Sequence, residues 1–111
     1  MSIDFPIEEA TVELSNGRKI VVRESTALDV DMLRELLNNT VASDDALSSE
    51  FHMCGLCLVK FIDKEGNEKI FPKVNNLNDL KQRMVIGSKD WAKIFEAYLR
   101  LNGHNPETLG K

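Results

Sequence analysis

Residues 10–22 read ATVELSNGRKIVV, and this stretch decides how the fold begins. Apolar and polar residues alternate on both sides of Gly17, which is the pattern of two half-buried strands joined by a tight turn. A two-residue turn would mix the buried and exposed faces of the two strands. A three-residue loop at 15–17 pairs Val12 with Ile20 and keeps the apolar side chains together. The sequence therefore predicts the three-residue loop, with Gly17 at a positive φ.

The residues after this hairpin predict two helices. Thr26 is a candidate N-cap, and Asp29 stands three residues later, where a carboxylate faces the unpaired N–H groups of a first helical turn. The apolar stripe of this helix consists of Val30, Leu33, Leu36, Leu37 and Val41. A loop and a second N-cap at 43–45 precede a shorter helix, which we expect Gly55 to end.

The second half of the chain begins with another predicted hairpin. The apolar run that opens residues 56–62 predicts a strand covered on both faces. A turn at 63–67 leads to a shorter strand at 69–71. Pro72 ends this strand because proline has no N–H to donate to a sheet.

Two further helices follow this hairpin. Asn76 or Asn78 is expected to cap the first, and Ser88 to cap the second. Apolar side chains at helical spacing predict that the last helix packs on the core, and they are Trp91, Ile94, Phe95, Tyr98 and Leu101. The alternative is that this stripe docks in the groove of a partner. Gly103 stands where a left-handed C-terminal cap would end the helix.

This order of elements predicts the fold class. Two β-hairpins, each followed by a pair of helices, indicate an α+β fold in a single small domain. We expect a flexible N-terminal arm at residues 1–9, the domain at 10–103 and a flexible C-terminal tail at 104–111.

The charge of the 111-residue chain limits its partners. The net charge is −4, whereas binding to nucleic acid requires an excess of Lys and Arg. No apolar run approaches the ~20 residues of a membrane span, and the first residues lack a secretory signal. We therefore expect a cytoplasmic protein that binds neither nucleic acid nor membrane.

The charge is also unevenly distributed along the chain. Residues 1–55 carry four basic and eleven acidic side chains, whereas residues 56–111 carry ten and seven. Two solvated faces would explain this asymmetry. The alternative is that an acidic surface docks on a basic one, in a second copy or in another protein.

One local pattern suggests metal or thiol chemistry. His52, Cys54 and Cys57 place an imidazole two residues ahead of a Cys-x-x-Cys pair. Such thiolates can share a zinc ion, but a structural site needs four ligands, and a redox pair needs its first Cys at a helix N-terminus. Packing of two small apolar side chains is the interpretation that the context favours.

The sequence gives little support to catalysis, and it points instead to a binding surface. Neither His has a nucleophile beside it, and the glycines are too isolated to form a phosphate loop. Leu28 and Met32 flank the acidic face of the first helix, which carries Asp31 and Glu35. We predict that these four residues contact a partner. No cofactor or metal is expected.

Residues 11–29 read TVELSNGRKIVVRESTALD and carry a family resemblance. A strand, a Gly followed by Arg or Lys, a second strand, Arg-Glu-x-Thr and an Asp on a helix resemble the small tail assembly chaperones of long-tailed bacteriophages. The stretch is also similar to related proteins that assist assembly of contractile-tail baseplates.

This resemblance implies a non-enzymatic protein of the host cytoplasm. It would bind the tape-measure protein, the tail-tube subunit, or both, during tail morphogenesis, and it could form a homo-oligomer. A long helical tape-measure chain exposes apolar stripes before assembly, and a chaperone would cover them. The alternatives are another phage morphogenetic or baseplate factor, and a small zinc or thiol protein that uses His52, Cys54 and Cys57.

Overall fold

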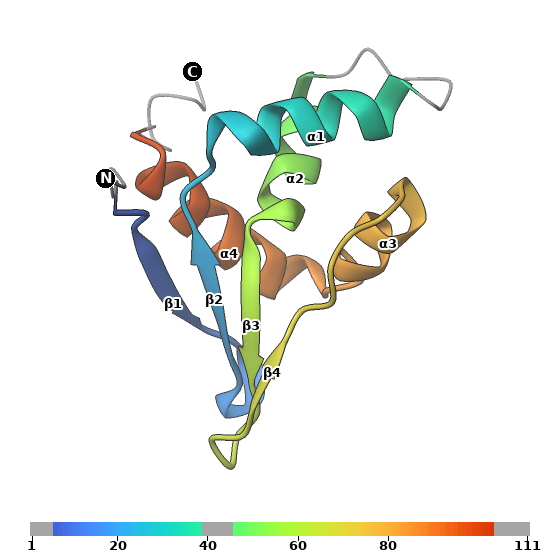
Figure 1. Ribbon diagram of the computed structural model, residues 1–111. Coiled ribbons are helices and arrows are strands. Elements are labelled where there is room, and N and C mark those ends of the chain that lie inside the picture. The colour runs from blue at the N-terminus through green and yellow to red at the C-terminus, as the bar shows by residue number, and fades with distance from the viewer. Residues whose placement is uncertain (1–5, 39–45, 104–111) are drawn as a thin grey trace, which may run out of the picture.

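The computed structural model describes residues 6–38 and 46–103, which form one α+β domain (Figure 1). Its strands are β1 (Glu9–Glu13), β2 (Lys19–Arg23), β3 (Leu58–Ile62) and β4 (Glu68–Ile70). Its helices are α1 (Ala27–Asn38), α2 (Ala46–Leu56), α3 (Leu77–Arg83) and α4 (Ser88–Leu101). The predicted order, two hairpins each followed by two helices, is confirmed. The predictions for residues 1–5, 41, 43–45 and 104–111 lie outside the described residues.

The first hairpin has the predicted register. Val12 lies opposite Ile20, and the Leu14 N–H donates to the Arg18 carbonyl at 2.7 Å, which closes a three-residue loop. Gly17 adopts a φ of +75° within this loop, as expected. Strand β1 begins at Glu9, one residue before the expected start.

The two hairpins join through β2 and β3 into one antiparallel sheet with the order β1-β2-β3-β4. A bulge interrupts this pairing, because Val22 lies opposite Leu58 whereas Val21 lies opposite Lys60. Val59 is the extra residue. The bulge keeps Leu58 on the side of the sheet that carries the core, to which Val59 does not belong.

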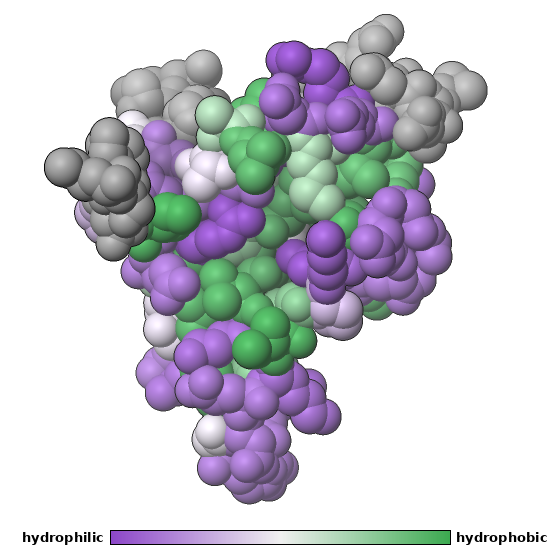
Figure 2. Space-filling view, viewed as in Figure 1, coloured by the Kyte–Doolittle hydropathy of each residue, from purple (hydrophilic) through white to green (hydrophobic). Residues whose placement is uncertain are grey.

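The helices lie on one side of the sheet. Helix α4 packs against β1 and β2, and α2 contacts α1, α3 and α4 (Figure 1). The buried core residues between these layers include Ile20, Val22, Leu80, Ile94 and Tyr98. No helix crosses the opposite face in the described part of the chain, and Figure 2 shows apolar residues over the middle of that face and polar residues over the hairpin loops.

The aromatic stripe of α4 packs on the core, as expected. Ile94 and Tyr98 are buried, and Trp91 and Phe95 pack against the cluster with part of their surface exposed. Phe51 of α2 contacts the Phe95 ring edge-on, with the ring centroids 4.7 Å apart. The stripe therefore joins two helices of the same domain.

Gly55 does not end α2, contrary to the prediction from the sequence. The helix continues to Leu56, and β3 begins at Leu58 instead of at residue 56. An added Cβ on Gly55 would lie 3.0 Å from Met84 Cγ and 3.1 Å from Leu80 Cδ1. The glycine therefore serves the close approach of α2 and α3, and tertiary packing outweighs its low helix propensity.

Four further expectations are corrected. Only Leu58 of β3 is fully buried, because most of the apolar run belongs to the end of α2 and the turn after it. Val30 is 44% exposed, whereas Met32 packs against the core, so the stripe of α1 is rotated toward Met32. Gly87, not Ser88, is the N-cap of α4. The second short strand spans Glu68–Ile70, one residue earlier than expected.

Three of the predicted helix-capping residues are confirmed, at the start of α1, at the start of α3 and at the end of α4. The Asp29 N–H contacts Thr26 Oγ1 at 3.3 Å, and the Thr26 N–H donates to Asp29 Oδ2 at 2.8 Å, so the two residues cap α1 reciprocally. Asn76 is the N-cap of α3, and its side chain accepts from the Asp79 N–H. Gly103 follows α4 at a φ of +79°.

Replacing Gly55 by Val tests the close approach of α2 and α3. The Val side chain has to displace Met84 and the fully buried Leu80, so we expect a loss of about 1–3 kcal/mol in the free energy of unfolding. Ala92→Val, at an exposed position of α4, is the matched control. It should lower the free energy of unfolding by only a fraction of that amount, because Val has a slightly lower helix propensity than Ala and displaces no neighbour there. Equal urea midpoints for the two variants would contradict the tight contact.

Candidate functional site

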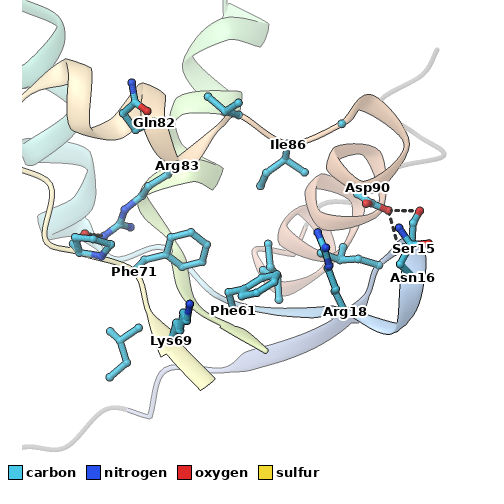
Figure 3. Close-up of a pocket in the computed structure, with 16 residues that line it drawn as sticks. Ser15, Asn16, Arg18, Phe61, Lys69, Phe71, Gln82, Arg83, Ile86 and Asp90 are labelled. Atoms are coloured by element: carbon cyan, nitrogen blue, oxygen red, sulfur yellow. Dashed lines mark hydrogen bonds between the residues drawn. The ribbon is translucent and has the colours of Figure 1, made fainter. Parts of the chain in front are cut away.

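A groove lies between the sheet and the segment that joins α3 to α4. Its volume is about 590 Å³. The first hairpin loop, β3, β4, α3 and the start of α4 all contribute to its lining. In Figure 3 the side chains of Phe61 and Lys69 rise from the sheet toward Ile86 of the joining segment. The groove is therefore assembled from parts of the chain that are far apart in sequence.

The floor of the groove is apolar. Phe61, Phe71 and Ile86 each keep part of their surface exposed while packing against the core. Two large apolar side chains at the groove are almost fully exposed, because Ile70 is 79% and Val85 is 80% exposed. Exposed apolar side chains beside an apolar hollow are typical of a surface that binds another molecule.

Two cations stand at the rim of the groove. Arg18 and Lys69 are exposed, and both line it (Figure 3). The acidic residue of the lining, Asp90, accepts from the Ser15 N–H at 3.0 Å and from Ser15 Oγ at 2.9 Å. The backbone hydrogen bond from Ser15 lowers the pKa of Asp90. Asp90 thus tethers the start of α4 to the hairpin loop, and the net charge of the groove lining is positive.

Arg83 forms the inner wall of the groove and is held in place by backbone carbonyls. Its Nη1 donates to the carbonyls of Gly55, Leu56 and Leu58 at 3.2–3.3 Å, and its Nη2 donates to the carbonyl of Pro72. Its guanidinium carbon lies 5.6 Å from the centre of the Phe71 ring. Burial lowers the pKa of Arg83. The residue therefore orders α2, β3 and β4 around the groove.

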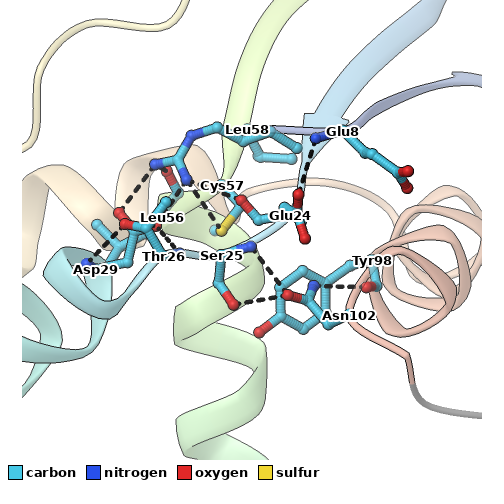
Figure 4. Close-up of polar contacts among 12 residues, drawn as sticks. Glu8, Glu24, Ser25, Thr26, Asp29, Leu56, Cys57, Leu58, Tyr98 and Asn102 are labelled. Carbon is cyan, nitrogen blue, oxygen red and sulfur yellow. Dashed lines mark hydrogen bonds and ion pairs between the residues drawn. The ribbon is translucent and has the colours of Figure 1, made fainter. Parts of the chain in front are cut away.

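A second polar cluster lies at the other end of β2 and joins this strand to α1 and α2 (Figure 4). Arg23 binds both carboxylate oxygens of Asp29, at 2.6 and 2.9 Å, and also contacts the carbonyl of Leu56 at 3.5 Å. Burial alone would raise the pKa of Asp29, but hydrogen bonds from Arg23 and Thr26 outweigh it and lower that pKa. The pair joins β2 to α1, and its charges satisfy each other.

A neutral hydrogen-bond chain extends this cluster to α4. The N–H and hydroxyl groups of Ser25 both donate to Asn102 Oδ1, at 2.9 and 2.7 Å. The Asn102 amide donates to the carbonyl of Tyr98 at 2.8 Å. These contacts fasten the end of α4 to the segment between β2 and α1, so this cluster stabilises the fold.

The motif of His52, Cys54 and Cys57 does not form a metal site. Both cysteines have no exposed surface, and burial raises the pKa of Cys54 and raises that of Cys57 to about 12. In the absence of a metal ion the thiols are therefore protonated at neutral pH, and a protonated thiol is a poor nucleophile. In the part of the chain that the structure describes, no three His, Cys, Asp or Glu side chains are grouped to hold a metal ion.

Of the four residues predicted to contact a partner, three are exposed and one packs against the core. Leu28 is 76% exposed, and Asp31 and Glu35 are also exposed. Met32 instead packs against the core. Helix α1 lies at the end of the molecule away from the two hairpin loops, so this surface is separate from the groove (Figure 1).

The groove was not predicted from the sequence. One signal was available, because Val85 and Ile86 form an apolar pair directly before Gly87, in a connection where polar turn residues are expected. The contributions of Phe61, Arg18 and Lys69 could not be recognised without the pairing of the two hairpins.

Comparison with protein-family models, curated proteins and solved structures finds no match to this chain. Among the helices of residues 6–38 and 46–103, none is long and apolar enough to cross a membrane.

The ion pair between Arg23 and Asp29 predicts a loss of stability in acid. Because the pKa of Asp29 is lower in the folded protein than the value of about 3.9 in an unfolded chain, its contribution is present above about pH 4 and is lost as the pH falls toward the folded pKa. We expect Asp29→Asn to lower the free energy of unfolding at pH 7 by about 2 kcal/mol and to flatten its dependence on pH between about 5 and 2.

Urea unfolding as a function of pH measures both effects. Asp31→Asn removes an exposed carboxylate of the same helix and serves as the control, with a profile that follows the unsubstituted protein. A profile of Asp29→Asn parallel to the unsubstituted one would contradict the assignment.

Proposed function

We propose that this domain is a non-enzymatic binding module that covers an apolar segment of another protein. The observation that carries the proposal is the groove, with its apolar floor and the exposed Ile70 and Val85 beside it. Fixed elements meet at this surface, and Arg83 and the Ser15–Asp90 contacts hold them in place. A preformed apolar surface loses little conformational entropy when it binds.

The polar groups of the groove favour binding over chemistry. The carboxylate of Asp90 accepts hydrogen bonds from Ser15, and Arg83 donates to four carbonyls. Groups held in this way position the backbone and are poorly placed to transfer protons. The apolar lining is what a bound chain would contact.

The resemblance of residues 11–29 to tail assembly chaperones suggests the partner. The proposed client is the tape-measure protein, with the tail-tube subunit as a further client, in the cytoplasm of the host. Long helices of a tape-measure protein expose apolar stripes before the tail is built, and such stripes aggregate. A groove that accepts apolar side chains would keep these segments in solution until assembly.

Co-expression with a tape-measure fragment tests this function. We expect the fragment to stay in the soluble fraction and to co-purify with this protein, whereas the fragment expressed alone precipitates. Ile70→Ser with Val85→Ser should abolish co-purification because both exposed contacts are removed. The substitutions should leave folding intact, because neither side chain is buried.

Leu28→Ser is the matched control, because Leu28 is also an almost fully exposed apolar side chain but lies on α1. It should retain the fragment. Loss of co-purification in Leu28→Ser alone would move the binding surface to α1, and precipitation of the fragment despite the unsubstituted protein would overturn the proposal.

A further inference from the structure

Helix α1 carries a surface whose chemistry complements the groove. Leu28, Asp31 and Glu35 are exposed and lie at positions i, i+3 and i+7, so they fall within about 60° of one another around the helix. We call these three residues the acidic strip. It presents one large apolar side chain, Leu28, 76% exposed, beside two carboxylates. Asp31 also lies 3.9 Å from Arg34 in an exposed ion pair, which is too weakly held to prevent another cation from approaching.

The groove offers the opposite charges around an apolar floor. Arg18 and Lys69 are exposed at its rim, with Phe61 between them in Figure 3. The other charged groups of the lining are committed, since Asp90 is bound by Ser15 and Arg83 by backbone carbonyls. Arg18 also interacts with the charge of Asp90, and Lys69 with that of Asp63, but neither cation is buried. These two exposed cations and the apolar floor match the two carboxylates and the leucine of the acidic strip.

We propose that the acidic strip of one copy docks in the groove of a second copy of this chain. Leu28 would cover the apolar floor, and Asp31 and Glu35 would lie near Arg18 and Lys69. The inference rests on the groove being the binding surface of the proposed function, but it commits to a different occupant.

The positions of the two surfaces make this contact head-to-tail. Helix α1 and the hairpin loops lie at opposite ends of the molecule, so a strip cannot reach the groove of its own copy (Figure 1). A contact between two different surfaces leaves one of each free, and copies therefore add until a ring closes or a filament extends.

Self-docking would also regulate the groove. The contact relies on two exposed charge pairs and one side chain, so it is weak and is screened by salt. A client with a larger apolar segment would displace the second copy. The groove would then be covered in the free protein and open to its client.

Two variants, each lacking one surface, test the proposal. Leu28→Ser, Asp31→Asn and Glu35→Gln together remove the acidic strip, and Arg18→Gln with Lys69→Gln remove the charges of the groove. Neutral replacements are used so that the two altered surfaces do not acquire a new attraction. Lys81→Gln with Lys93→Gln removes two positive charges, as the groove variant does, at exposed positions outside the groove lining, and is the control for that variant.

Sedimentation measures the mass of each protein at about 10 mM salt, where the Debye length is about 30 Å, and again at about 1 M, where it is about 3 Å. We expect the mass of the unsubstituted protein and the control to rise with concentration at low salt and to fall to the monomer at high salt. Each surface variant alone should stay monomeric. Their equimolar mixture should form a dimer and grow no further, because it contains one intact strip facing one intact groove.

An unsubstituted protein that is monomeric at low salt and high concentration would overturn the proposal, and so would a mixture that stays monomeric. Self-association of either surface variant like that of the control would overturn it as well. Co-purification of the tape-measure fragment with the strip variant is measured separately. The strip variant should retain the fragment, because its groove is intact. If the unsubstituted protein stays monomeric and yet retains the fragment, the groove remains a client site and only the docking of a second copy is refuted.

Discussion

The carboxyl end of α2 is the constraint on which the rest of the structure depends. The helix runs into β3 through a single turn residue, Cys57, whose N–H still bonds to the carbonyls of Met53 and Cys54. The carbonyls of the buried Gly55 and Leu56 have no such partner in a continuing helix. Two arginines from distant parts of the chain supply the donors. Arg83 donates to Gly55 and Leu56, and Arg23 also reaches the Leu56 carbonyl. These hydrogen bonds to the end of α2 therefore fix β2, α2 and α3 relative to one another.

The groove follows from this arrangement. Because Arg83 is fixed on these carbonyls, α3 ends beside β4, and a short segment with Val85 and Ile86 has to cross to α4. The contacts between Ser15 and Asp90 fix the far end of that crossing. The segment spans the end of the sheet without filling the space beneath it, so apolar side chains stay accessible there. The proposed binding surface is therefore a consequence of how the helices are anchored.

Local patterns predicted most of the fold, and contacts between distant segments explain what they missed. The register of the first hairpin was predictable because only one pairing keeps Val12 and Ile20 on one face. Gly55 was misinterpreted as a helix end because its role depends on Leu80 and Met84, which the local pattern does not contain. Leu28 was predicted to be exposed, but the groove was not foreseen, since its lining comes from two hairpins and two helices that only the fold brings together.

Backbone NMR of the labelled protein during titration with a tape-measure fragment would show whether this domain acts through its groove. High salt keeps the charges of α1 screened during the titration. We expect amide shifts to change in two segments that are distant in sequence, around Ile70 and Phe71 and around Val85 and Ile86. Changes confined to α1, or a spectrum unaltered by excess fragment, would contradict this expectation.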